Sequence, residues 1–118
     1  MSGIPSGNGS EVLKRASYHA LSNAWQTMIT GVANHIYTVL NITWAEEGGN
    51  PEGIGLRVDI SAAGSNQVVL MNNGTSLPAY ETFIWNDRIV LTGTDKLEVY
   101  STAGNVDIYV SYIDQDWT

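Results

Sequence analysis

Hydrophobic and polar residues alternate strictly along several stretches of this chain. One stretch runs from Ile54 to Ala62, where apolar residues occupy the even positions and Gly, Arg, Asp and Ser the odd ones. Another runs from Val106 to Tyr112, where Val, Ile, Val and Tyr alternate with Asp, Tyr and Ser. A period of two, in segments rich in β-branched and aromatic residues, predicts strands with one buried face.

Turn signals divide the rest of the chain into further short strands. Clusters of Gly, Asn, Pro and Ser predict turns or loops at residues 31–34, 46–53, 63–65 and 72–75. Strands are then expected at residues 25–30, 35–44, 66–71, 80–85, 88–91 and 96–100. Residues 101–105 have the length and composition of a hairpin loop that joins the strand at 96–100 to the one that starts at Val106.

The strand at residues 35–44 is the longest of these, and its pattern assigns its two faces. Tyr37 is expected on the outer face. The face expected to be buried carries Ile36, Thr38, Leu40, Ile42 and Trp44.

Residues 11–21 fit two interpretations. Val12, Leu13, Ala16, His19 and Ala20 form a short helical stripe, with Ser10 as the N-cap. The same residues also fit a strand from Val12 to Leu21. The strand is favoured, because every later segment is β and a lone helix would need its own surface to pack on.

These segments predict an all-β fold: one antiparallel β-sandwich or jelly roll of about eight strands over residues 11–118. Residues 1–10 are expected to form a flexible arm, because Gly and Ser dominate and Ile4 is the only apolar anchor after Met1. Ten extended residues reach at most ~35 Å, far enough to lie across a neighbouring molecule. A frayed terminus is the other interpretation.

Net charge and composition exclude some classes of function. The net charge is −7, with no basic stripe, which argues against nucleic acid as a partner. No window approaches the ~20 apolar residues of a membrane span. Charged residues make up 14% of the chain, below the ~25% that is usual. Either other subunits cover much of the surface, or the sandwich faces are rich in Ser, Thr and Asn.

The sequence offers no convincing catalytic or metal centre. His19 and His35 are predicted to lie on separate strands, and no nucleophile elbow accompanies them. The carboxylates of Glu46, Glu47 and Glu52, or of Asp114 and Asp116, could collect around Ca²⁺, but neither group has a calcium-loop pattern. A solvated acidic loop is the better interpretation. No enzyme activity, cofactor or metal is therefore expected.

Aromatic residues are the better candidates for function. Four Trp and six Tyr are too many for one core of this size. Trp44 and Tyr112 are in phase with buried faces and are expected to be structural, whereas exposed aromatics anchor protein interfaces or stack on sugars. The residues expected at an interface are Ile4, Trp25, Tyr37, Trp85, Tyr109 and Trp117.

Several segments together resemble a known class of protein. They are Leu77-Pro78-Ala79-Tyr80-Glu81-Thr82, Ile89-Val90-Leu91, Asp95-Lys96-Leu97, Gly104-Asn105-Val106-Asp107 and Val110-Ser111-Tyr112-Ile113-Asp114. They are similar to the C-terminal half of small virion proteins of tailed bacteriophages, and residues 35–40 resemble the central strand of those proteins. The resemblance implies a non-enzymatic β-sandwich that assembles as an oligomer, often a trimer, on the capsid, neck, tail or fibres.

Two functional hypotheses follow. The first is a capsid decoration, or cement, protein in the virion, which contacts other copies of itself and the major capsid protein or another virion protein. Residues 1–16 would pair with a neighbour's strand edge, and Tyr37 and Tyr109 would supply a symmetric contact. The second is a carbohydrate- or receptor-binding module of a phage head, neck or tail fibre, with Trp25, Trp85 or Trp117 as the sugar platform. An enzyme ranks last.

Overall fold

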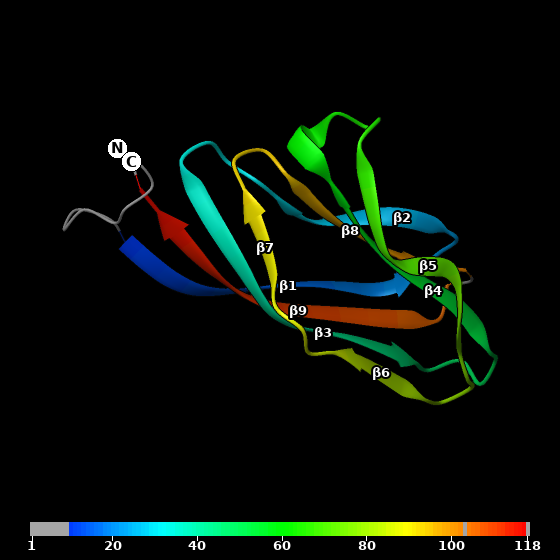
Figure 1. The fold of residues 1–118 in the computed structure, drawn as a ribbon. Helices are drawn as coiled ribbons and strands as arrows, with labels where there is room; N and C mark the ends of the chain where they lie inside the picture. The colour runs from blue at the N-terminus through cyan, green and yellow to red at the C-terminus, as the bar shows by residue number, and fades with distance from the viewer. Residues whose placement is uncertain (1–9, 103, 118) are drawn as a thin grey trace.

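The computed structural model describes residues 10–102 and 104–117 (Figure 1). Ile4 and the rest of the expected arm up to residue 9 lie outside the described residues. The elements are β1 (Ser10–Leu21), β2 (Ala24–Thr30), β3 (His35–Glu46), β4 (Glu52–Asp59), the 3₁₀ turn η1 (Ile60–Ala62), β5 (Gln67–Leu77), β6 (Thr82–Trp85), β7 (Ile89–Thr92), β8 (Lys96–Ser101) and β9 (Val106–Asp116).

The strands form two antiparallel sheets that pack face to face (Figure 1). The first sheet has the order β1-β9-β3-β6, and β7 also pairs with β3; the second has the order β2-β8-β4-β5. Strands from the first half of the chain pair with strands from the second half, as in one long folded hairpin. The successive pairs are β4·β5, β3·β6/β7, β2·β8 and β1·β9. This is the strand order of a jelly roll, so the predicted all-β sandwich is confirmed.

The hydrophobic core lies between the two sheets. Both contribute side chains that are almost completely buried: Val39, Ile42, Trp44, Leu91, Val106 and Val110 from the first sheet, and Ile54, Leu56, Leu97 and Val99 from the second. Each large apolar side chain buried in this way contributes about 1.5–3 kcal/mol. The expected structural role of Trp44 is confirmed, and Tyr112 packs against the edge of this core.

The predicted hairpin between β8 and β9 is wrong. β8 pairs with β2 and β4 in the second sheet, whereas β9 pairs with β1 and β3 in the first. The connection therefore crosses from one sheet to the other. A loop of this composition can make either connection, and the buried faces of both strands decide between them.

The predicted turn at residues 72–75 is also wrong. β5 continues through it as a bulge, because Ile54 pairs with Thr75 while Leu56 pairs with Met71. The Asn72 side-chain oxygen accepts the N–H of Gly74, and the Asn72 carbonyl accepts the Thr75 hydroxyl. The Asn-Gly signal thus forms a local turn inside a strand rather than ending it.

The favoured strand at residues 11–21 is confirmed as β1. It pairs with β9 of the same chain from Ser10↔Asp116 to Leu21↔Val106. Residues 10–16 pair with β9 along one edge only, so the expected pairing of this segment with a neighbour stays a prediction. The outer edge of β1 is the end of the first sheet.

A bulge in β3 reverses the predicted faces of its first half. Val39 pairs with Tyr112 and Asn41 with Ser111, so Leu40 is an extra residue on β3. Tyr37 and Val39 therefore face the core before the bulge, and Ile42 and Trp44 after it. Strict alternation assigned Tyr37 to the outer face because it cannot foresee an inserted residue.

Across residues 10–102 and 104–117, no helix has the length and apolar character needed to cross a membrane.

Candidate interaction surface on the first sheet

The outer face of the first sheet carries a candidate interaction surface. Strand pairing arranges its side chains in rows across β1, β9 and β3: Leu13–Ile113–Thr38, Arg15–Ser111–Asn41 and Ser17–Tyr109–Thr43. Successive residues of a strand point to opposite faces, so the alternate residues of β9, such as Val110 and Ile108, lie in the core. β9 thus presents one face to the core and the other to a partner or to solvent.

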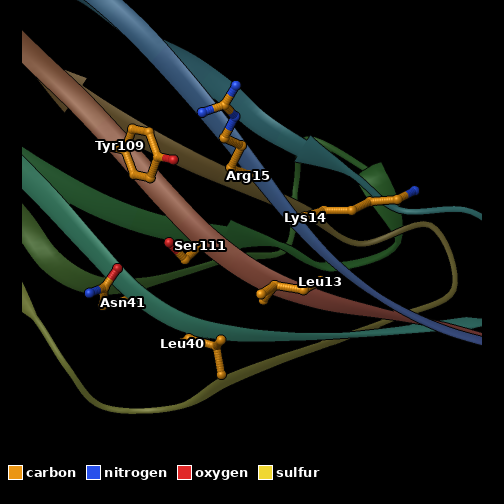
Figure 2. A pocket seen from close by; sticks show the side chains of 7 residues that line it. All are labelled: Leu13, Lys14, Arg15, Leu40, Asn41, Tyr109 and Ser111. Atoms are coloured by element: carbon orange, nitrogen blue, oxygen red, sulfur yellow. The ribbon is translucent and has the colours of Figure 1, made fainter.

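A groove of about 530 Å³ crosses these rows. It is lined by Leu13, Lys14, Arg15, Leu40, Asn41, Tyr109 and Ser111, and is called the outer groove below (Figure 2). The bulge in β3 helps to shape it, because both Leu40 and its neighbour Asn41 line it. Leu13 is 71% exposed, so the groove has an exposed apolar side chain on the β1 side.

Tyr109 lies at the centre of this face. It is 42% exposed, and its hydroxyl accepts a hydrogen bond from Arg15, which raises the pKa of the Arg15 guanidinium above its usual value. A ring held by a neighbouring side chain loses less conformational entropy when a partner covers it. Tyr109 therefore has the exposure and the support expected of an interface anchor.

A second groove of about 250 Å³ adjoins the first and shares Tyr109 with it. Its lining comprises Ser17, Tyr18, His19, Thr43, Ala45, Asp107, Ile108 and Tyr109. Two partly exposed tyrosines, Tyr18 and Tyr109, therefore line this groove, next to a polar end formed by His19 and Asp107.

That polar end gathers three possible metal ligands from distant parts of the chain. His19 on β1, Glu47 after β3 and Asp107 on β9 have ligand atoms within 4.8 Å of one another, and His19 Nδ1 lies 2.7 Å from Asp107 Oδ1. The hydrogen bond with Asp107 raises the pKa of Glu47, because the protonated Glu47 carboxyl donates to the Asp107 carboxylate. Burial raises the pKa of Asp107, but the Ala20 N–H, Glu47 and His19 outweigh it and hold that pKa below its usual range. This mutual satisfaction explains the cluster without an ion.

The acidic loop between β3 and β4 is mostly exposed at residues 47–51, as expected, but the glutamates at its two ends are buried. Glu46 is 4% exposed, and its carboxylate accepts the N–H groups of Gly48, Gly49 and Tyr80 at 2.8–2.9 Å. Burial alone would raise the pKa of Glu46. The hydrogen bonds from these backbone N–H groups outweigh burial, so the pKa of Glu46 lies below its usual value. Glu52 is also buried and accepts the Thr102 hydroxyl. Both carboxylates hold loops in place.

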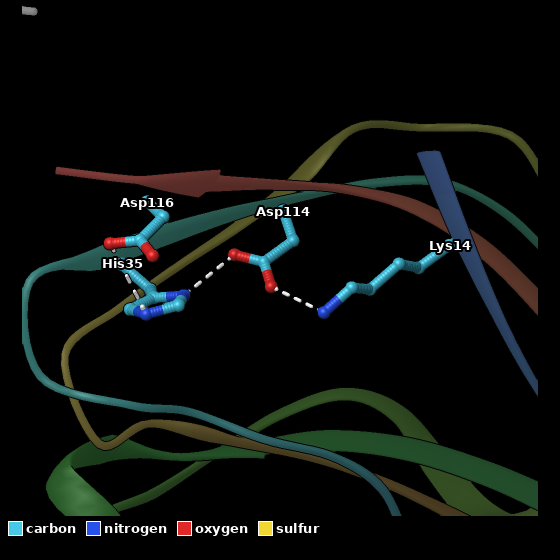
Figure 3. Close-up of polar contacts among 4 residues, drawn as sticks. All are labelled: Lys14, His35, Asp114 and Asp116. Carbon is cyan, nitrogen blue, oxygen red and sulfur yellow. Dashed lines mark hydrogen bonds and ion pairs between the residues drawn. The ribbon is translucent and has the colours of Figure 1, made fainter. Parts of the chain in front are cut away.

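A second polar cluster lies at the other end of the sheet. Asp114 is 5% exposed, and its two oxygens meet Lys14 Nζ and His35 Nδ1, each at 2.8 Å (Figure 3). His35 Nε2 lies 3.5 Å from Asp116. Burial raises the pKa of Asp114, but the bonds from Lys14 and His35 outweigh it and hold the pKa below its usual range. No serine or threonine is part of this cluster, so it ties β1, β3 and β9 together rather than forming a catalytic triad.

The predicted interface residues differ in their exposure. Tyr109 is exposed as expected, but the prediction that Tyr37 lies on the outer face is wrong, since Tyr37 is 4% exposed. Trp25 is partly buried, with Arg57 4.0 Å above its ring and Tyr100 beside it. Trp85 packs against the core and donates its ring N–H to the Asp87 carbonyl. Trp117 is partly buried, and within the described part of the chain its ring N–H has no partner.

The sequence reasoning missed the residues that make the outer groove, above all Leu13 and Leu40. One signal was present: Leu13 is a large apolar residue directly before Lys14 and Arg15, in a segment that fits an edge strand. Leu40 gave no such signal, because its exposure depends on the bulge.

Comparisons with known proteins support the fold. No protein-family model and no curated protein matches this chain. A chain in the structure of the infectious bursal disease virus Gt strain aligns at a TM-score of 0.50 with 11% identity, over 95% of this chain and 33% of that one. A chain of the disulfide-linked pili of Bacillus endospore appendages aligns at 0.47 with 12% identity, over 99% and 96%. A pentameric capsid protein from metagenomic phage sequences aligns at 0.42 with 16% identity, over 90% and 62%. This chain thus spans about a third of the viral chain, and the likeness is one of fold.

Proposed function

We propose that this protein is a non-enzymatic bacteriophage virion structural protein, and that it acts as a capsid decoration, or cement, protein. The outer groove on β1, β9 and β3 carries the proposal. It joins exposed apolar residues, a supported tyrosine and the cationic side chain of Arg15 on one face of a sheet, and Lys14 also lines it. A partner bound there would bury Leu13 and Tyr109, and its polar groups would replace water around Lys14 and Arg15.

The charge distribution favours a protein partner with an acidic rim. Lys14 and Arg15 are two of only five Lys and Arg residues in the chain, and both line the outer groove. Lys14 is already paired with Asp114, while its own side chain remains 46% exposed. An acidic group of a partner would therefore pair with Arg15, while apolar groups of the partner pack on Leu13 and Leu40. Contacts of this kind can be individually weak, because a particle presents many copies at high local concentration.

Image reconstruction of the particles whose genome encodes the chain tests the proposal directly. A sandwich of 49 × 29 × 20 Å is expected at regular positions on the head, with the outer groove against another virion protein. Density at the neck, tail or fibres would replace the cement role with another structural role, and particles that lack the protein would contradict the proposal altogether.

A variant series sharpens that test. Leu13→Ser together with Tyr109→Ser should reduce the number of copies per particle, measured by quantitative mass spectrometry, while circular dichroism remains that of the wild type. Val32→Ser is the matched control, because Val32 is 50% exposed in the turn between β2 and β3, outside the groove. Equal occupancy for all three proteins would remove the outer groove from the mechanism. Deletion of residues 2–9 tests the arm separately.

One observation favours the second candidate, a carbohydrate- or receptor-binding module. Tyr18 and Tyr109 line adjoining grooves, and polar groups suited to sugar hydroxyls surround them. Trp25 is a poor sugar platform, since Arg57 covers its ring. A glycan array separates the candidates: saturable binding that Tyr109→Ser abolishes and Trp25→Ser preserves would support the module over cement.

A further inference from the structure

The second sheet ends in a strand whose outer edge has no partner. Across residues 10–102 and 104–117, β5 pairs only with β4. Such an edge presents a row of N–H and C=O groups that can pair with another strand, and proteins usually protect it with charge, proline or a covering loop.

The middle of this edge is apolar instead. Val68, Val69 and Leu70 are consecutive and are 46%, 56% and 37% exposed. Val68 pairs with Val58 and faces the core side, and Val69 pairs with Arg57 on the outer side. The apolar surface therefore extends over both faces of the edge, so a partner must approach the edge itself to cover it.

The absence of charged residues along β5 favours a second copy of this chain as the partner. From Ile60 to Tyr80 the chain has no Asp, Glu, Lys, Arg or His, although the whole chain carries −7. Like charges directly opposite each other destabilise a strand pair. Two copies of an acidic protein can therefore meet along β5 without placing like charges opposite each other. The edge of β1 carries Glu11, Lys14 and Arg15, and the edge strands β6 and β7 are joined by a loop with Asp87 and Arg88.

We propose that two copies of this chain pair antiparallel through β5, about a two-fold axis at Val69. The pairing would join two four-stranded sheets into one, cover Val68, Val69 and Leu70 of both copies, and close both edges at once. It involves the second sheet, on a different part of the molecule from the outer groove, so it goes beyond the function proposed above.

The oligomeric state of the full chain in solution tests this pairing. The 12.8 kDa chain should elute as a species of twice that mass in size exclusion with light scattering. Val69→Lys places two ammonium groups opposite each other at the axis and should weaken the dimer by about tenfold or more. The matched control is Val90→Lys, a 58% exposed valine on the edge strand β7 of the other sheet, which should remain dimeric.

Mixing charge variants tests the two-fold symmetry. Val69→Lys and Val69→Glu should each be monomeric alone and should form a heterodimer when mixed, because the axis then places opposite charges together. Monomeric wild type, dimeric Val69→Lys, or a mixture that stays monomeric would overturn the pairing. A wild-type trimer would also overturn it, yet would leave the self-association expected of a virion protein intact. Circular dichroism of each variant confirms that folding is unchanged.

Discussion

The edge strands β1 and β5, one in each sheet, differ in character. β1, at the edge of the first sheet, carries Glu11, Lys14 and Arg15 and is tied to β9 by the ion pair of Lys14 with Asp114. β5, at the edge of the second sheet, has no charged residue and exposes Val68, Val69 and Leu70. Charged side chains are one of the usual protections of an edge strand against pairing, and β5 lacks that protection.

This difference assigns the two edges to different kinds of partner. The face beside β1 combines apolar and cationic groups and suits a partner with acidic groups, while β5 suits a second copy. The following predictions test the comparison, from the largest expected effect to the smallest.

Asp114→Asn should loosen the β1 edge most. The substitution removes the charge that Lys14 and His35 share, and hydrogen bonds to charged groups contribute about 1.5–3 kcal/mol. We expect the free energy of unfolding in urea to fall by that amount. Asp87→Asn, at an exposed position between β6 and β7, is the control and should change it by less than about 0.5 kcal/mol. Equal losses for the two variants would show that the cluster in Figure 3 does not hold β1.

Acid should affect β1 before β5. The folded-state pKa of Asp114 lies below the unfolded value, so its contribution is present above the unfolded pKa, near 3.9, and is lost as the pH falls through the folded pKa. Asp107, whose pKa is also lowered, acts in the same direction, while Glu47, whose pKa is raised, opposes it. Residues 60–80 have no acidic residue and no histidine.

Hydrogen exchange followed by mass spectrometry checks this asymmetry. Between pH 7 and pH 3, after correction for intrinsic rates, amides of β1 should lose more protection than those of β5. In Asp114→Asn the additional loss in β1 should be smaller. Uniform loss along both strands would mean that acid unfolds the sandwich as one unit.

The smallest effects should come from single exposed apolar residues. Leu13→Ser and Val69→Ser should each change the stability of the monomer by less than about 0.5 kcal/mol. The two variants should differ in concentration dependence. A self-pairing β5 makes the melting temperature of the wild type and of Leu13→Ser rise with protein concentration, and Val69→Ser should weaken that rise. Scanning calorimetry over a hundredfold range of concentration distinguishes them, and identical slopes would argue against pairing through β5.

The sequence predicted the faces of some strands and failed on one for an identifiable reason. In β9 the alternation from Val106 to Val110 gave the buried positions directly. In β3 the same rule failed at Tyr37, because Leu40 is an inserted residue that shifts the phase by one. The hydrophobic residues on either side of Leu40 fit both phases about equally well, so only pairing with β9 identifies the bulge.

The candidate sites depended still more on tertiary structure. Tyr109 could be chosen from its phase on β9 alone. Leu13, Leu40 and Arg15 could not be placed together, because they meet only when β1 and β3 flank β9. The cluster of His19, Glu47 and Asp107 also joins three elements that are remote in sequence.

The sequence by itself determined that this chain is a β-sandwich, since periods of two, frequent turn signals and few charges act locally and permit little else. It also determined that residues 60–80 are uncharged. Tertiary structure alone decided that β8 and β9 belong to different sheets, that Tyr37 is buried, and that β5 is left at an edge. These features depend on which strands pair, and pairing is fixed by the packing of the two sheets rather than by any single segment.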